Sequence, residues 1–356
     1  MESMSANYMG TFGNKNGLTP NLDSLCKVSW LFKNAYSAGI HTNNGVFSTL
    51  YSFPALKRTR PMSTIPSRIY SGLPYTLKQE GYKNMFFTTH DKLFDNLANF
   101  IPSNFFDNLY SAQDYPKDKI IGPFGVPDDY LFTFATNILN KQDSLKPFFA
   151  TILSTSNHDP YILPSYFKSS LKEKDLRAVS YADWSIGKFM EQAKKEKWFD
   201  NTIFIFVADH GLNVGKNPYE ISLSYHHVPI IMYSPKILGE SKNIDNFIGQ
   251  IDIFPTLMGI LNFNYTNNTL GVDVLKNPRE CIYFSSDDKI GCINSNWLYV
   301  YTFGGNESLY KYKNGDTKNY LKENKEESEK LKVYSFSQTQ TSQWIYNSNK
   351  SCITKK

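Results

Sequence analysis

The 356-residue sequence contains no apolar run of about 18 residues, the length that a membrane-spanning helix needs. It also lacks a basic start followed by an apolar stretch, so its beginning does not resemble a signal peptide. Its four cysteines form no CxxC pair and no zinc-ribbon spacing, and they leave the redox compartment open. We therefore expect that any membrane anchor of the intact protein is absent from this chain.

The sequence also lacks a continuous stretch of basic residues. The net charge is only +5, and basic residues mostly alternate with acidic ones, as in LKEKDLR and LKENKEESEKLK. Such alternation is typical of solvated surfaces. We expect no nucleic-acid partner. With 41% hydrophobic residues, the chain is long enough to bury a substantial core.

Short apolar runs alternate with helical patterns, which predicts an α/β fold with a mostly parallel central sheet between helices. Strands are expected at residues 84–89, 147–155, 202–208 and 228–233. Between the second and third of these, apolar residues recur at helical spacing, which predicts an amphipathic helix. Thr19 and Pro20 mark the start of another helix, and QIDIFPTLMGILNF indicates a buried one.

The pattern of apolar and polar residues changes near residue 275. We expect a catalytic domain over residues 1–275, a small antiparallel subdomain over 276–317, and a polar helix with a tail over 318–356. Cys281 and Cys292 flank a predicted hairpin and could be bridged, although burial as small apolar side chains is the preferred interpretation.

The strongest local signal is VADHG, in which Asp209 and His210 follow a buried strand. Open α/β folds place their sites at this end of the sheet. A carboxylate and an imidazole there can bind one metal ion. The alternative is a capping aspartate beside a structural histidine, and we favour the metal.

Thr42 lies in a turn, and a helix starts directly after it. A hydroxyl at a helix N-terminus lies beside free N–H groups that attract phosphoryl oxygens. A threonine in this position is more commonly a simple N-cap. A catalytic role for Thr42 therefore depends on which other residues lie near it. Three of the six histidines follow predicted strands: His90, His158 and His210. They are expected to share one site. His226 and His227 could line the site or the surface, and His41 is left out of the chemistry.

Taken together, these motifs resemble those of a known family. The sequence is similar to the extracellular catalytic domain of lipoteichoic acid synthase and related sulfatase-like phosphoglycerol transferases of the alkaline phosphatase superfamily. The resemblance spans residues 1 to about 275. It rests on the stretches MESMSANYMG, LTPNLDSL, FKNAYSAGIHTNNG, FFTTHDKLFDN, STSNHDPY, VADHG, HHVPIIMYSP and DIFPTLMGILN.

The resemblance implies one divalent cation, Mn²⁺ in preference to Mg²⁺ or Zn²⁺, held by Glu2, Thr42, Asp209 and His210. Only one residue precedes Glu2, so we expect this ligand to be the least firmly held. The resemblance also implies substrate contacts from His90 and His158. A tryptophan and an arginine of the family are not evident here, and the sequence offers Phe94 and Asn96 instead. We include Asn96 and His227 among the expected substrate-binding residues.

By this resemblance, the expected function is transfer of phosphoglycerol from a phosphatidylglycerol-type lipid to an envelope polymer or glycan, through a covalent phosphothreonine. Catalysis would take place on the extracellular or periplasmic side of the cell membrane. Alternatives are a phosphoethanolamine transferase, a sulfatase or phosphatase of the same superfamily, and a non-catalytic domain that binds an envelope polymer. A sulfatase is disfavoured because TNNGV at residues 42–46 lacks the Cys/Ser-x-Pro-x-Arg pattern that formylglycine formation requires. A two-metal phosphatase would need a second ligand cluster, which could include Asp159 or His227.

Overall fold

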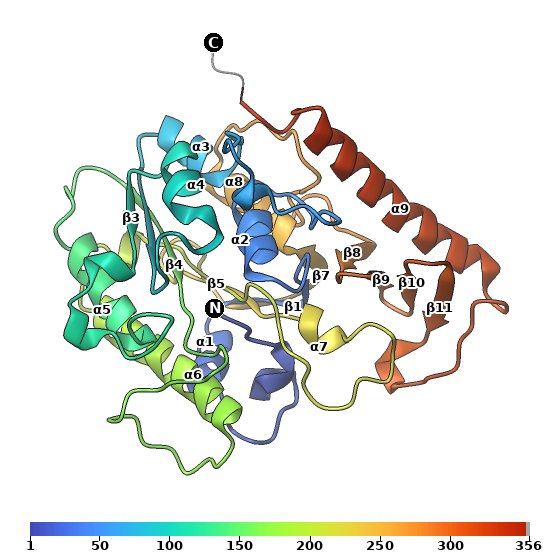
Figure 1. The fold of residues 1–356 in the computed structure, drawn as a ribbon, viewed down its shortest axis with the longest axis horizontal. Coiled ribbons are helices and arrows are strands. Elements are labelled where there is room, and N and C mark those ends of the chain that lie inside the picture. Colours follow the sequence, from blue (N-terminus) through green and yellow to red (C-terminus); the bar gives the residue numbers. More distant parts are fainter. Residues whose placement is uncertain (354–356) are drawn as a thin grey trace.

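The computed structural model describes residues 1–353, and within them the strands form three sheets (Figure 1). The first sheet has the order β5-β6-β1-β7, the second β3-β2-β4, and the third β11-β10-β9-β8. The strand bounds are β1 (Trp30–Tyr36), β2 (Lys83–Thr88), β3 (Asn108–Tyr110), β4 (Phe148–Leu153), β5 (Phe204–Val207), β6 (Ile230–Tyr233), β7 (Lys242–Gly249), β8 (Cys281–Ser285), β9 (Lys289–Asn294), β10 (Leu298–Thr302) and β11 (Asn306–Tyr310).

Helices cover both faces of the first two sheets. The α-helix bounds are α1 (Pro20–Cys26), α2 (Thr42–Tyr51), α3 (Leu73–Gln79), α4 (Leu97–Ser103), α5 (Asp128–Leu139), α6 (Lys174–Ala193), α7 (Leu223–His226), α8 (Ile253–Leu261) and α9 (Lys325–Asn347). In Figure 1, α2, α3, α4 and α8 lie on one side of these strands, and α1, α5 and α6 lie on the other.

The alternation of side chains along β2 produces this layering. Phe86 is buried in a core that includes residues of α2, α3, α4 and α8. Its neighbours Met85 and Phe87 point the other way, into a core with α5. Successive residues of a strand point to opposite faces, so an apolar run such as MFF needs a cover on each side. The predicted α/β class, with helices on both faces of the sheet, is confirmed.

The first sheet is mixed rather than wholly parallel. β6 runs antiparallel to both β5 and β1, whereas β1 and β7 are parallel. All strands of the second sheet are parallel. The sequence did not identify β1 or β7 as strands. Lys33 and Asn34 interrupt the apolar run of β1, and the first half of edge strand β7 is largely exposed.

The third sheet is antiparallel, as predicted for the region after residue 275. α9 packs against β8, β9 and β10, and Leu331 from α9 is fully buried beside Cys281 and Cys292. Both cysteines are buried and unbridged, which confirms the preferred interpretation. The boundaries proposed for these units stay predictions, and residues 354–356 of the expected tail lie outside the described residues. Within residues 1–353, no helix is both long and apolar enough to span a bilayer.

Candidate active site

Three of the predicted metal ligands come together at the carboxyl ends of β4 and β5. Glu2, Asp209 and His210 each offer one ligand atom, and these three atoms lie within 4.8 Å of one another. All three residues are buried. Asp209 and His210 follow β5, whereas Glu2 reaches the site from the other end of the sequence. No second group of three such ligands occurs in residues 1–353, so the structure offers no partner cluster for a second metal there.

Glu2 is held firmly, contrary to the expectation for a residue so near the start of the sequence. The Met1 ammonium group donates a hydrogen bond to Val207 O at 2.7 Å, and the Asp209 N–H donates to Met1 O at 3.1 Å. Ser3 Oγ donates to Glu2 Oε1 at 2.6 Å, which orients the carboxylate. These backbone contacts with the end of β5 position Glu2 in the site.

The Asp209 carboxylate has one occupied oxygen and one free oxygen. Oδ1 accepts hydrogen bonds from the N–H groups of Ser3 and His210, both at 2.8 Å. Oδ2 is buried and has no hydrogen-bond partner within residues 1–353. His210 Nδ1 donates to Gly211 O, because a carbonyl only accepts, so Nε2 presents its lone pair. This Nε2 lies 3.5 Å from Asp209 Oδ2 and 3.9 Å from Glu2 Oε1.

The cluster is electrostatically unfavourable without a counter-ion. Burial raises the pKa of the Glu2 carboxyl well above its usual value, and the adjacent Asp209 carboxylate raises it further. An unpartnered buried oxygen is also costly. A divalent cation would satisfy Asp209 Oδ2 and remove the repulsion between the carboxylates. The residues present therefore fit one divalent cation with mixed oxygen and nitrogen ligands.

Thr42 is the first residue of α2, one position earlier than expected. It follows the loop that leaves β1, and it is half-buried. The preceding residue His41 makes no side-chain capping bond to the helix. The first turn therefore keeps backbone N–H groups available at the positive end of the helix dipole. This arrangement suits an anionic phosphoryl group next to the Thr42 hydroxyl.

Gly45 brings this helix against the ligand cluster. A Cβ atom added at Gly45 would lie only 2.1 Å from Asp209 O, closer than any real contact. The first turn of α2 thus rests directly on the Asp209 backbone, with no side chain between them. Thr42 lies in the same turn of α2, three residues before this contact, and its role as a fourth metal ligand stays a prediction.

His90 and His158 stand on either side of an aromatic residue that the sequence reasoning missed. The Phe124 ring centroid lies 5.6 Å from that of His90 and 4.6 Å from that of His158. Phe94 stacks on the opposite side of His90 at 3.9 Å. Burial, followed by the proximity of His158, lowers the pKa of His90 to about 4, so this imidazole is neutral at physiological pH.

A pocket of about 320 Å³ opens beside His158. Residues 121–127 form one wall, and Thr155, Ser156 and Ile162 contribute to the others. The wall is largely apolar, because it consists of aliphatic, proline and phenylalanine side chains.

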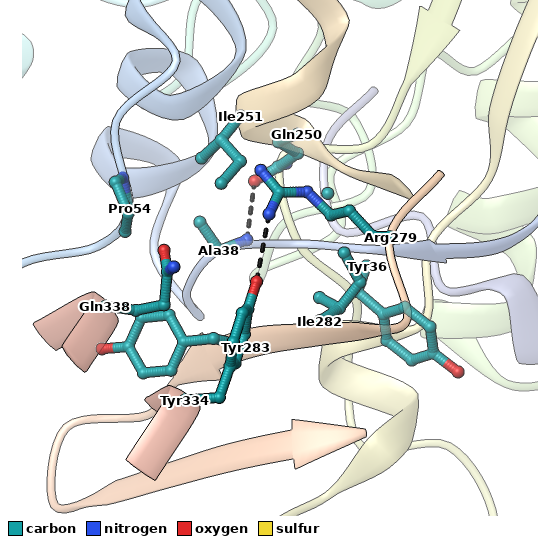
Figure 2. A pocket seen from close by; sticks show the side chains of 11 residues that line it. Tyr36, Ala38, Pro54, Gln250, Ile251, Arg279, Ile282, Tyr283, Tyr334 and Gln338 are labelled. Atoms are coloured by element: carbon teal, nitrogen blue, oxygen red, sulfur yellow. Dashed lines mark hydrogen bonds between the residues drawn. The ribbon is translucent and has the colours of Figure 1, made fainter. Parts of the chain in front are cut away.

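Gln250 is a second residue that was not predicted. Its Nε2 donates to the carbonyl oxygens of Ala208 and Asp209, both at 2.7 Å, and its Oε1 accepts from Ala38 N–H at 2.9 Å. Figure 2 shows Gln250 beside Ala38 in a pocket of about 310 Å³. Gln250 therefore joins the end of β5 to the loop that leads to Thr42. In the sequence, Gln250 stands only at the start of QIDIFPTLMGILNF, a stretch expected to form a buried helix.

The third sheet also contacts the loop that leads to Thr42. The Ser285 N–H donates to Ala38 O at 2.9 Å, and His41 Nε2 pairs with Asp287 Oδ1 at 2.8 Å. In Figure 2, Arg279 bonds to the hydroxyl of Tyr334 on α9, across the junction between this sheet and the body. His41 therefore has a structural partner, consistent with its exclusion from the chemistry.

The structure does not bring Asn96 or His227 to the ligand cluster as substrate-facing groups. Asn96 Nδ2 donates to Met62 O at 3.0 Å and thereby ties two loops together. His227 Nε2 bonds to Lys33 O at 3.0 Å, and its ring packs between Phe12 and Tyr36. Both side chains are bonded within the protein in this structure, and their assignment to substrate binding stays a prediction.

Comparison with known proteins relates this site to a family. The family model described as Sulfatase matches residues 1–263. The chain is 24% identical over 330 residues to the lipoteichoic acid synthase of Staphylococcus saprophyticus, covering 86% of this chain and 49% of that protein. It is 28% identical over 219 residues to phosphoglycerol transferase I of Xanthomonas campestris, covering 54% of this chain and 30% of that protein. The chain spans about half the length of the lipoteichoic acid synthases that it matches.

Among solved structures, the fold matches the lipoteichoic acid synthase LtaP of Listeria monocytogenes with a TM-score of 0.84 at 22% identity. The match covers 98% of this chain and 90% of that one. At this level of identity the comparison establishes the shared fold.

Proposed function

Because the chain belongs to the sulfatase family, in the sulfatase-like group of the alkaline phosphatase superfamily, we propose that it is the catalytic domain of a phosphoglycerol transferase. It would transfer glycerol phosphate from a phosphatidylglycerol-type lipid to an envelope polymer or glycan. We place this reaction on the extracellular or periplasmic side of the cell membrane.

One observation carries the proposal. The main chain of Asp209, one of the three clustered ligand residues, lies against the first turn of a helix that begins with Thr42. A cation bound there, which we propose to be Mn²⁺, would lower the pKa of the Thr42 hydroxyl and neutralise charge on the phosphoryl group.

In the first half-reaction, Thr42 Oγ1 attacks the lipid phosphorus. A bond forms between Oγ1 and phosphorus and the bond from phosphorus to the diacylglycerol oxygen breaks. The hydroxyl proton passes to water, which returns a proton to Thr42 in the second half-reaction. The free N–H groups of the first turn of α2 bind a phosphoryl oxygen. In the second half-reaction, an acceptor hydroxyl attacks the glycerophosphoryl-threonine and releases Thr42.

The two histidines have different environments and therefore different roles. His90 is buried and neutral, so it serves as a hydrogen-bonding group for a phosphoryl oxygen. His158 is exposed at the mouth of the site, where it can donate a proton to the diacylglycerol oxygen and recover one from the acceptor hydroxyl. The Phe124 ring contacts both imidazole rings.

Thr42 also argues against sulfatase activity. The formylglycine nucleophile of sulfatases forms from cysteine or serine, and none of the four cysteines of this chain lies in the required motif. A phosphoethanolamine transferase would use the same threonine, so the headgroup of the donor must be tested directly.

The decisive experiment is intact-mass analysis after incubation with phosphatidylglycerol and Mn²⁺. We expect a glycerophosphoryl adduct on the wild type, no adduct on Thr42→Ala, and a reduced but detectable adduct on Thr42→Ser, which keeps the hydroxyl. Equal adducts on wild type and Thr42→Ala would overturn the mechanism.

A parallel incubation with phosphatidylethanolamine tests the headgroup. A phosphoethanolamine adduct that forms faster than the glycerophosphoryl adduct would reassign the donor. If neither lipid modifies wild-type protein that binds Mn²⁺, the result would favour a binding domain without catalysis.

A further inference from the structure

Two loops next to Thr42 form a surface with an unusual composition. The first loop covers residues 57–67, after α2, and the second covers residues 91–96, after β2. Asn96 joins them through its hydrogen bond to Met62 O. Asn43, which follows Thr42, donates to Ser63 Oγ at 3.4 Å. The two loops therefore form one continuous rim at the start of α2.

Each loop carries a large apolar side chain that points into solvent. Ile65 is 85% exposed and Leu93 is 74% exposed. A single exposed apolar residue on a surface is ordinary. Two of them on contacting loops beside a candidate active site form a patch that is available to a partner.

Cations surround these apolar tips. Lys57, Arg58 and Arg60 are exposed on the first loop, and Lys92 is exposed on the second. None of the four forms an ion pair with a carboxylate in residues 1–353. The first loop contains no acidic residue.

Nearby acidic groups neutralise the positive charge of these loops only in part. Asp95 lies close to Arg60 and to Asn43, and burial raises its pKa. Asp91 accepts hydrogen bonds from Gln113 and from the Leu93 N–H, so its carboxylate is oriented toward these two donors. Lys57 lies over the ring of Phe303, and this cation–π contact leaves Lys57 positively charged. Arg58 and Lys92 remain without a counter-charge within residues 1–353.

We propose that this rim, with Ile65 and Leu93 as apolar tips and Lys57, Arg58, Arg60 and Lys92 as cationic flanks, docks on the surface of an anionic phospholipid bilayer. The tips would enter the headgroup region while the cations contact lipid phosphates. The inference rests on the proposed function, because it explains how Thr42 meets the phosphate of a lipid that remains in its membrane.

Docking of this kind has a characteristic dependence on charge and salt. Each Lys or Arg close to an anionic surface strengthens binding roughly fivefold, and the effect falls off within a Debye length. We therefore expect the chain to bind vesicles that contain phosphatidylglycerol at low salt. Binding should weaken at high salt and on pure phosphatidylcholine.

The test is vesicle flotation of the 356-residue chain, with a control loop elsewhere on the molecule. Two double variants remove the surface: Ile65→Ser with Leu93→Ser, and Arg58→Glu with Lys92→Glu. The matched controls lie in the loop before β4, where Leu145 is 90% exposed and Lys141 and Lys146 are also exposed. This loop is at the opposite end of β4 from the candidate site. The controls are Leu145→Ser, and Lys141→Glu with Lys146→Glu.

We expect each rim variant to lose at least tenfold in vesicle affinity and the control variants to bind as the wild type does. Adduct formation with monomeric short-chain phosphatidylglycerol should be unchanged in all of them. This second assay reports on the proposed function alone, so its failure is distinguishable from failure of docking. Rim variants that float as well as the wild type would overturn the proposal. So would a wild type that binds soluble polyglycerol phosphate but not anionic vesicles.

Discussion

Gly45 and Asp209 lie in backbone contact, and a Cβ atom at Gly45 would come within 2.1 Å of Asp209 O. One of these residues follows the proposed nucleophile by three positions, and the other is a proposed metal ligand 164 residues further along the chain. The distance between nucleophile and metal is thus set by a contact between two main chains, which has little freedom to adjust.

Gly45→Ala should therefore separate Thr42 from the ligand cluster. The added methyl group forces the helix or the end of β5 to move. We expect a destabilisation of about 1–3 kcal/mol and a loss of adduct formation on the order of 100-fold. Urea unfolding and the rate of adduct formation measure the two effects. Gly249→Ala is the control, because a Cβ there would meet its nearest neighbour at an ordinary 3.5 Å. Equal rates in both variants would contradict this interpretation.

Gln250 should act as a positioning residue for the metal. Gln250→Glu keeps the shape of the side chain but loses the N–H groups that hold Ala208 O and Asp209 O. Loss of such supporting contacts typically lowers metal affinity about 10- to 100-fold. Calorimetric titration with Mn²⁺ measures the effect. Gln338→Leu, from the pocket in Figure 2, is the matched control and should bind Mn²⁺ normally. If Gln250→Glu binds Mn²⁺ with unchanged affinity, Gln250 has only a structural role.

Metal binding should stabilise the fold through Glu2. Saturation at about 100 times the dissociation constant adds about 2.7 kcal/mol to the free energy of unfolding. We expect Mn²⁺ to raise the melting temperature of the wild type, and to raise that of Glu2→Gln much less. Asp128→Asn provides the comparison, since Asp128 is buried but accepts hydrogen bonds from Thr155 and Ser156 instead. That variant should melt lower and keep the full response to Mn²⁺.

His90 should make stability depend on pH. Its pKa falls from 6.5 to about 4 in the folded state, so the unfolded chain binds more protons between these values. Stability contributed by neutral His90 is complete above pH 6.5 and is lost as pH falls toward 4. The shift corresponds to a contribution on the order of 3 kcal/mol.

Urea unfolding at several pH values between about 4 and 6.5 tests this prediction. His90→Asn should show a shallower rise of stability with pH than the wild type, whatever its absolute stability. A pH slope identical to that of the wild type would mean that His90 is not held neutral by the fold.

Several features of the fold were predictable because they depend on local patterns. The apolar runs at residues 84–89 and 202–208 became β2 and β5, and helical spacing predicted α6. β1 and β7 were missed because their polar residues hide the strand pattern, and pairing with neighbours supports them instead. The direction of β6 depends on its neighbours in space, which its own residues do not specify.

The residues of the candidate site were likewise predictable only in part. Asp209, His210 and Thr42 were identified because each stands at the boundary of a predicted element. Asn96 was named from the family resemblance and His227 from its position before a predicted strand, and both side chains bond to main-chain oxygens elsewhere in the protein. A residue type at a strand end indicates where chemistry can occur, but it does not specify which way the side chain points.

The sequence by itself determined which chemical groups are present and at which ends of strands and helices they lie, because helix and strand patterns are properties of neighbouring residues. Only the tertiary structure decided that Glu2 is bound to the end of β5, that Gln250 joins two loops, and that Phe124 contacts both His90 and His158. These contacts bring together residues that are dozens to hundreds of positions apart. They form only when the whole core packs, so no local pattern can encode them.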